Sequence, residues 1–337
     1  MNARFVCFGE LLLRLGAPHR ELLLQSPQLD VHVGGAEANV AVALARFGHA
    51  VTMVSTLPDQ ALGNAALDEL RRHGVDVGGV RRGPGRMGLY FLQTGALHRP
   101  SEVIYDRAGS AFASAPPQVY DWPAILQGWE FLHLSGVTPA LGKAGARAAI
   151  DAARTARALG LTVVFDGNYR SKLWQAWDGD APAILCEILE CADIAFADQR
   201  DIAIVLRHEM ADDGEAATRA AADAAFSRFP QLSRMICTRR RQISVDRHFL
   251  SAASYSRAAS LSTGEIELNG IVDRIGAGDA FAAGVLHGRV SGMDEAEALR
   301  FGLAAGCLKH SVPGDFLRLG VADVQAMLGE LRYDVRR

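Results

Sequence analysis

Hydrophobic and polar positions along this chain follow two periods, one typical of strands and the other of helices. Short apolar runs that indicate buried strands lie at 50–57, 129–136, 161–168, 193–198 and 234–238. Segments typical of helices lie before, between and after them, at 36–48, 63–74, 145–160, 181–192, 215–229, 278–290 and from Ala296 to about His310. Strands alternating with helices of this length predict βαβ units, and therefore a doubly wound, mostly parallel α/β sheet covered on both faces.

The pattern near the N-terminus departs from this rhythm. A strand is expected over 4–15, with a bend at Gly9 and Glu10, and another over 29–35 that ends in a glycine pair. The runs at 87–95 and 101–109 alternate apolar and polar residues and predict a hairpin. We therefore expect a small β-sheet lid, inserted from about 10–34 and 86–108, within a single domain that spans residues 1–337.

Composition narrows the class of protein. The 337 residues are 49% hydrophobic, which allows a large core, and the net charge of −3 favours neither nucleic acid nor an anionic membrane as a partner. Five cysteines without a C-x-x-C pair and a start unlike a signal peptide predict free thiols in the cytoplasm. No apolar run is long enough to cross a membrane, and the ten histidines lack metal-site spacing, so no protein metal site is predicted.

The stretch "DRIGAGDAFAAG", residues 273–284, contains the most suggestive chemistry. A helix N-terminus presents backbone N–H groups and the positive end of its dipole, and glycines allow an anion to approach closely. The N–H groups of Gly276, Ala277 and Gly278 would then form an anion hole. Asp279 beside them is placed to accept a proton from a hydroxyl, as phosphoryl transfer to an alcohol requires. An ordinary helix cap fits the same residues equally well.

Other candidate binding residues lie at loops and at strand-to-helix turns. In "VGGAEANVA", residues 33–41, Glu37 and Asn39 are polar residues at an otherwise apolar helix start. They predict either a capped tight turn or hydrogen bonds to a polyhydroxy ligand. Arg107 and Arg170 each end a segment that contains an aromatic residue, and arginine pairs bidentately with carboxylate or phosphate. Solvated surface arginines are the alternative.

One motif points to a different class of protein. "GPGRMG", residues 83–88, has the letters of the dinucleotide-binding fingerprint and would suit an NAD-dependent oxidoreductase. That fingerprint requires a strand before it and a helix after it, whereas a strand-like run follows here. A glycine-rich turn that leads into the hairpin is favoured.

Taken together, "VDRIGAGDAFAAG" and "GGAEANVAVALARFG" resemble the two signatures of the ribokinase-like (PfkB-type) carbohydrate kinases. The resemblance spans almost the whole chain and implies a doubly wound α/β fold with a small β lid. It also implies phosphorylation of a sugar hydroxyl, with ATP and Mg²⁺ as cofactors and a monovalent cation as a further candidate. Asp279 would be the general base, and Gly276, Ala277 and Gly278 the anion hole.

Within that family, the chain is most similar to the 2-keto-3-deoxygluconate kinases, through "GLYFL", "VIYDRAGSAFA", "FDGNYRSKLW" and "KHSVPGDF". The implied reaction transfers phosphate to the 6-hydroxyl and forms 2-keto-3-deoxy-6-phosphogluconate. An acid substrate independently suits a pair of arginines, which a neutral sugar does not need. The implied substrate-binding residues are Gly34, Gly35, Ala36, Glu37, Asn39, Tyr90, Tyr105, Arg107, Arg170 and Asp315.

The nucleotide side departs from the family pattern. The usual Asn-x-x-Glu reads "ADQRD" at 197–201, so Asp198 and Asp201 are substitutes, and "CTRRRQIS" at 237–244 lacks the usual glycines. The residues implied for ATP are Asn168, Thr238, Arg239, Gly276 and Gly278. Other sugar kinases, of the fructokinase or ribokinase type, and a sugar-acid-binding protein without catalysis remain alternatives. The exposed edge of a β lid predicts a homo-oligomer.

Overall fold

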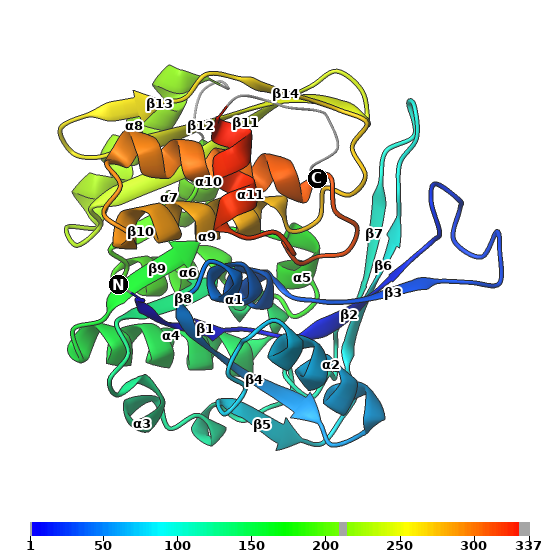
Figure 1. The fold of residues 1–337 in the computed structure, drawn as a ribbon. Coiled ribbons are helices and arrows are strands. Elements are labelled where there is room, and N and C mark those ends of the chain that lie inside the picture. Colours follow the sequence, from blue (N-terminus) through cyan, green and yellow to red (C-terminus); the bar gives the residue numbers. More distant parts are fainter. Residues whose placement is uncertain (1, 209–213, 330–337) are drawn as a thin grey trace.

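A large twisted sheet runs through the molecule (Figure 1). The computed structural model describes residues 2–208 and 214–329. The strand order is β13-β12-β11-β10-β9-β8-β1-β4-β5, and β14 also pairs with β12. The strands are β1 (Arg4–Phe8), β4 (Ala50–Pro58), β5 (Val80–Gly83), β8 (Phe131–Ser135), β9 (Thr162–Asp166), β10 (Ile194–Phe196), β11 (Arg234–Gln242), β12 (Arg247–Tyr255), β13 (Ser260–Ser262) and β14 (Ile266–Asn269).

The sheet is parallel from β5 to β11 and antiparallel beyond it. β1 pairs with β4 on one side and with β8 on the other, so the chain winds in both directions from this central strand. β12 lies antiparallel to β11, and β13 and β14 both pair with β12. In such sheets the carboxyl ends of the parallel strands meet at one edge, where ligands bind.

Helices cover both faces of this sheet because successive strand side chains point to opposite faces. In β1, Val6 and Phe8 belong to one core, and Phe5 and Cys7 to the other. The first core contains side chains of α3 (Trp122–Leu126), α4 (Lys143–Ala158), α5 (Ser171–Gln175), α6 (Ala181–Leu189), α7 (Gln199–Leu206) and α8 (Glu215–Arg228). The second contains side chains of α1 (Ala36–Arg46), α2 (Ala61–Arg72), α9 (Ala277–Val290), α10 (Glu295–Lys309) and α11 (Val321–Leu328).

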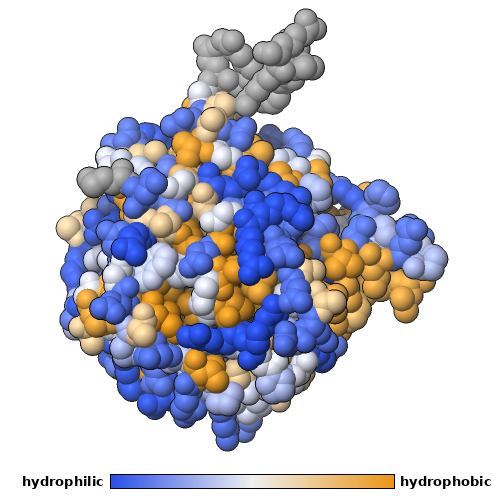
Figure 2. All heavy atoms as spheres, turned by 60° about the horizontal axis from the view of Figure 1, so that its bottom comes forward, coloured by the Kyte–Doolittle hydropathy of each residue, from blue (hydrophilic) through white to orange (hydrophobic). Residues whose placement is uncertain are grey.

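A separate four-stranded sheet stands at one side of the molecule, at the right in Figure 1. Its order is β3-β2-β6-β7, with β2 (Leu12–Gly16), β3 (Asp30–Gly34), β6 (Gly88–Gln93) and β7 (Glu102–Asp106). All four strands fall within the two segments predicted for the lid. The loop between β2 and β3 projects outward, and Figure 2 shows hydrophobic residues on the projecting part at the right. Leu24, in the loop between β2 and β3, is 83% exposed, and Val31, on β3, is 59% exposed.

The predicted fold class is confirmed: a doubly wound α/β fold with a small second sheet. The run at 4–15 forms two strands in different sheets, because the chain leaves the large sheet after Phe8 and enters the small one at Leu12. The sequence pattern did not predict strands β12 to β14, because they lie at an antiparallel edge of the sheet, outside the alternation of strands and helices. Across the described ranges, no helix is long and apolar enough to cross a membrane.

Candidate active site

Two adjoining cavities open at the carboxyl ends of the parallel strands. One has a volume of about 450 Å³ and the other of about 460 Å³. Residues of the N-terminal signature, the small sheet and the α9 N-terminus line the second, called here the sugar-side cavity. The first, the nucleotide-side cavity, is lined from β9, β10, α7 and β11. The two cavities share Asp166, Asn168, Arg170 and Gly278, which mark the place where they meet.

The turn before α9 is built around Gly276. This residue caps the helix with φ +79°, a left-handed conformation that glycine adopts without strain. A Cβ atom at this position would lie 2.0 Å from the carbonyl oxygen of Asp315. Ala277 donates its N–H to the Arg274 carbonyl at 3.3 Å, while Gly278 is exposed to the cavity. The 14-residue helix therefore points its positive end at the junction of the two cavities.

Asp279 lies on the first turn of α9 and lines the sugar-side cavity. Asn39 Nδ2, from α1, donates a hydrogen bond of 2.7 Å to Asp279 Oδ2, which joins the two signature segments. Burial raises the pKa of Asp279 to about 7, and the Asn39 hydrogen bond opposes this rise. A carboxylate with a pKa near neutrality, held in one orientation, is suited to accept a proton.

This pKa predicts a pH dependence. A general base acts in its ionised form, so kcat/KM should fall as the pH decreases through about 7 and level off above it. Asn39→Leu removes the hydrogen bond that lowers the pKa of Asp279, so the fall in kcat/KM should occur at a higher pH in this variant. The pH profile of kcat/KM for both proteins checks this, and a wild-type profile that stays level through about pH 7 would contradict it.

Buried ion pairs hold the polar wall of the sugar-side cavity. Tyr90 donates its hydroxyl hydrogen to Asp315 Oδ2 at 2.8 Å, and Arg14 Nε contacts Asp315 Oδ1 at 3.1 Å. Arg107 Nε pairs with Glu10 Oε2 at 2.5 Å. Burial raises the pKa of Asp315 to about 6, while the charge of Arg14 opposes the rise. The small sheet thus contributes Tyr90 and Arg107 to the cavity in fixed orientations.

Arginines also line the junction. Arg170 is exposed, and its Nη1 donates to the carbonyl of its neighbour Tyr169 at 3.0 Å. Arg240 on β11 and Arg274 in the loop before α9 line the sugar-side cavity with it. These three arginines bring positive charge to this end of the cavity, beside the carboxyl groups of Asp166 and Asp279, and they suit an anionic ligand.

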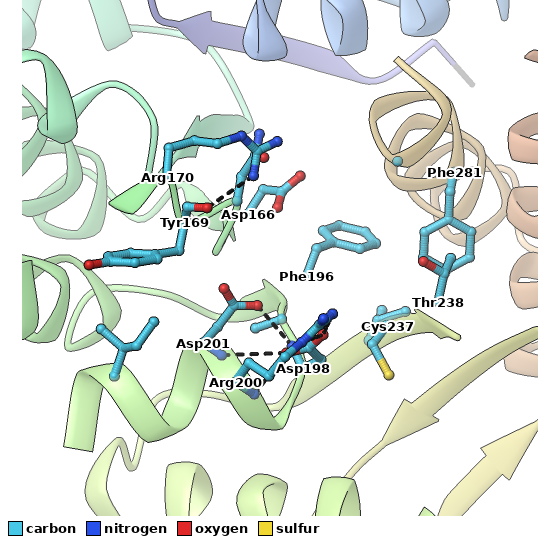
Figure 3. A pocket seen from close by; sticks show the side chains of 15 residues that line it. Asp166, Tyr169, Arg170, Phe196, Asp198, Arg200, Asp201, Cys237, Thr238 and Phe281 are labelled. Carbon is cyan, nitrogen blue, oxygen red and sulfur yellow. Dashed lines mark hydrogen bonds and ion pairs between the residues drawn. The ribbon is translucent and has the colours of Figure 1, made fainter. Parts of the chain in front are cut away.

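Three carboxylates, those of Asp166, Asp198 and Asp201, line the nucleotide-side cavity (Figure 3). Asp198 caps α7 by accepting from the N–H of Arg200 and Asp201, and the Asp201 carboxylate accepts from the N–H of Asp198 at 3.0 Å. Burial and then the charges of Asp279 and Asp201 raise the pKa of Asp166 well above its usual value. The pair that replaces Asn-x-x-Glu is therefore a capping box that keeps an acidic side chain at this position.

Most of the residues predicted for the site meet at these cavities. Asn168 and Gly278 line both cavities, and Thr238 lines the nucleotide-side one. The sugar-side cavity is also lined by Gly35, Ala36, Asn39, Tyr90, Tyr105, Arg107, Arg170, Gly276, Ala277, Asp279 and Asp315.

Three predicted residues do not line either cavity. Glu37 is 1% exposed in the core, where its Oε1 accepts from the N–H and hydroxyl of Ser135 and from the Thr138 hydroxyl. Gly34 faces the Asp315 carboxylate and provides the space that this group occupies. Arg239 points to the opposite face of β11, where it donates to the Tyr255 hydroxyl at 2.8 Å.

The structure adds three residues that the sequence did not predict. Asp166 ends β9, and its place at the carboxyl end of a predicted strand was an available signal. Arg240 follows Thr238 by two residues, so strand alternation puts both on the same face. No sequence pattern pointed to Arg14, because its partners Asp273 and Asp315 come from the far end of the chain.

"GPGRMG" forms the turn between β5 and β6. Gly88 begins a strand and no helix opens there, so the motif lacks the helix N-terminus that would hold a pyrophosphate. The structure therefore gives the oxidoreductase alternative no dinucleotide site at this motif.

The sequence was compared with family models and with known proteins. The model described as pfkB family carbohydrate kinase matches residues 2–231 and 259–316. The chain belongs to the pfkB family of carbohydrate kinases. A 2-dehydro-3-deoxygalactonokinase of Haloferax volcanii is 34% identical to this kinase over 330 residues, which cover 97% of each chain. A 2-dehydro-3-deoxygluconokinase of Thermoproteus tenax is 29% identical and covers 92% of this chain and 89% of its own.

A solved structure agrees with this assignment. The 2-dehydro-3-deoxygluconokinase of Thermotoga maritima superimposes on this kinase with a TM-score of 0.92 and 36% identity. The match covers 98% of this kinase and 100% of that chain. The likeness therefore extends over both sheets.

Proposed function

We propose that this kinase transfers the γ-phosphoryl group of ATP to the 6-hydroxyl of 2-keto-3-deoxygluconate. The observation that carries the proposal is the junction of the two cavities at the N-terminus of α9. Asp279 lies on the sugar side of this junction, with Arg107 and Arg170 lining the same cavity. A base, a helix N-terminus and two arginines in one cavity suit an acidic substrate whose hydroxyl is to be phosphorylated. The names of the relatives support the same substrate class.

In this proposal, Asp279 accepts the proton of the substrate's terminal hydroxyl as that oxygen attacks phosphorus. Asn39 holds the carboxylate in place through its hydrogen bond. The positive end of α9 stabilises the negative charge on the transferring group. Arg107 and Arg170, which both line the sugar-side cavity, bind the substrate carboxylate, and the small sheet acts as a lid that excludes water.

The donor set of the nucleotide-side cavity suits Mg²⁺ held jointly with ATP phosphates. Mg²⁺ usually takes one or two carboxylates, substrate phosphates and water rather than a complete protein cage. Asp166 and Asp201 are carboxylates with raised pKa values that a divalent cation would favour in ionised form. The described residues contain no cluster of three or more side chains that would hold a metal by themselves. When bound, Mg²⁺ would neutralise phosphate charge.

The proposal is tested by ADP release from ATP and Mg²⁺ over a panel of acceptors. The panel contains 2-keto-3-deoxygluconate, its C4 epimer, gluconate, fructose and ribose. We expect the keto acid to give the highest kcat/KM. The C4 epimer is the second candidate, because the Haloferax volcanii relative is named a galactonokinase. A higher kcat/KM with fructose or ribose would refute an acid substrate.

Arg170→Ala should raise the KM for the keto acid by about 10-fold or more and change kcat less, because a charge-assisted contact is worth about 1.5–3 kcal/mol. Its side chain is exposed and has no carboxylate partner in the described part of the chain, so folding should be unaffected. Arg107→Ala should raise the same KM but also lower the melting temperature, since Glu10 would lose its buried partner. Steady-state kinetics measure the change in KM of each variant, and thermal unfolding measures the change in its melting temperature. An unchanged KM in Arg170→Ala would contradict the carboxylate role.

We also infer a homo-oligomer and a cytoplasmic location. The exposed apolar side chains of the small sheet and its loop, among them Leu24, Val31 and Ile104, support pairing between subunits. All five cysteines are free, as expected in a reducing compartment. Light scattering tests the assembly, and a monomer at high concentration would refute it.

A further inference from the structure

Two arginines from distant segments lie at the α9 end of the sugar-side cavity. Arg240 is on β11, and Arg274 is in the loop directly before α9. Both line the cavity together with Gly276, Gly278 and Asp279. Both are exposed to solvent, so a ligand can reach their guanidinium groups.

Strand alternation explains why Arg240 is at the cavity and its neighbours are not. Arg239 donates to Tyr255 and lies 3.6 Å from Glu215. Arg241 pairs with Glu265 at 2.6 Å and covers the Phe249 ring. These two residues share one face of β11, and Arg240 shares the other face with Thr238. Of the three consecutive arginines, only the middle one is therefore directed to the site.

Within residues 2–208 and 214–329, neither of the two cavity arginines has a counter-ion. In the described part of the chain, neither the Arg240 nor the Arg274 guanidinium makes a hydrogen bond or an ion pair, although most other arginines do. Partial desolvation of the Arg240 guanidinium, followed by the positive charges of Arg274 and Arg200, lowers the pKa of Arg240. Like charges placed beside a helix N-terminus repel each other until an anion binds.

We propose that Arg240 and Arg274 form a clamp that binds the oxygens of the transferring phosphoryl group beside the N-terminus of α9. This proposal rests on the proposed function and adds two residues to its chemistry. The bond between the substrate's 6-oxygen and phosphorus forms, and the bond from phosphorus to the bridging oxygen of ATP breaks. That electron pair leaves with ADP, and the hydroxyl proton passes to Asp279. The guanidinium groups transfer no proton, because they stay charged throughout.

The clamp stabilises the transition state more than the bound substrates. Planar guanidinium groups bind phosphate oxygens bidentately, and they neutralise charge that spreads over the equatorial oxygens during transfer. Arginines that act in this way contribute about 10³–10⁵ in kcat in other phosphoryl-transfer enzymes. Because two arginines share this role here, we expect replacement of either one to lower kcat by less, about 10²-fold.

The test compares Arg240→Met and Arg274→Met with the matched control Arg241→Met. Each clamp variant should lose about 10²-fold in kcat, with the KM for the keto acid changed less than about twofold. Arg240→Lys keeps the positive charge but loses the planar guanidinium group that binds two oxygens at once. Its kcat should therefore be higher than that of Arg240→Met and lower than that of the wild type. Arg241→Met should retain wild-type kinetics, and all three methionine variants should keep the wild-type melting temperature.

A second measurement needs no sugar acid. Isothermal titration with ATP and with ADP, each with Mg²⁺, should show weaker ATP binding in both clamp variants and unchanged ADP binding. Unchanged kcat with unchanged ATP binding would overturn the clamp. A raised KM for the keto acid at constant kcat would also overturn it, because it would assign the arginines to the substrate carboxylate. If no sugar acid is phosphorylated by the wild type, the proposed substrate fails, and the contrast between ATP and ADP binding still decides the clamp.

Discussion

Asp279→Asn is expected to lower kcat by about 10²–10⁴-fold while ATP and the keto acid still bind. The amide has the shape of the carboxylate, and its carbonyl oxygen can still accept the hydrogen bond that Asn39 donates to Asp279. What it loses is the capacity to take the hydroxyl proton. Because this carboxylate is the proton acceptor in the proposed reaction, the loss should be confined to the chemical step.

Steady-state kinetics and titration calorimetry of the variant check this expectation. We expect kcat to fall and the dissociation constants of ATP and the keto acid to stay within about threefold of wild type, since the lining of the cavity is kept. Asp59→Asn, at an exposed aspartate away from both cavities, serves as the control and should be fully active. Near-wild-type turnover of Asp279→Asn would refute the general-base role.

Gly276→Ala should have the second large effect, through the backbone. The residue has φ +79°, which costs a non-glycine residue roughly 1–2 kcal/mol. The new Cβ would also lie 2.0 Å from the Asp315 carbonyl oxygen, so the backbone must shift. A shift here misplaces the N–H groups at the start of α9. Loss of a single donor of this kind costs about 10²–10³ in kcat. We therefore expect both activity and stability to fall.

Gly278→Ala is the matched stability control. Its φ lies outside the left-handed range, and a Cβ there would meet no protein atom within 4 Å. Thermal unfolding should show a lower melting temperature for Gly276→Ala and an unchanged one for Gly278→Ala. The kcat of Gly276→Ala is measured well below its melting temperature, so that unfolding does not contribute. Equal melting temperatures for the two variants would contradict the strain at Gly276.

Prediction from the sequence worked best where a signal is local. "GAGD" combines glycines with a carboxylate at a helix start, and all four residues line the sugar-side cavity. The alternating runs of β6 and β7 predicted their hairpin for the same reason, since strand period and turn residues are near neighbours in the chain. Whether Asp279 was only a cap depended on a distant contact, the hydrogen bond from Asn39.

Prediction was weakest where the role of a residue depends on the direction of its side chain or on contacts between distant segments. Arg239 was chosen from three consecutive arginines, and the registration of β11 against β12 turns Arg240 to the cavity instead. Glu37 looked like a ligand group because it is polar beside glycines. It is instead a buried acceptor for Ser135 and Thr138, which come from a strand end about a hundred residues away in the sequence.

The sequence by itself determined the α/β alternation, the small second sheet, the signature around Asp279 and the membership in the carbohydrate kinases. These follow from periodicity and from motifs whose residues are close in the chain. Only the tertiary structure decided which charged side chains face the cavities, which are buried as structural partners, and that Arg14 ties the small sheet to Asp273 and Asp315. The physical reason is that a pattern specifies the faces of each helix and strand, whereas the partner of a charge depends on which distant segments pack together.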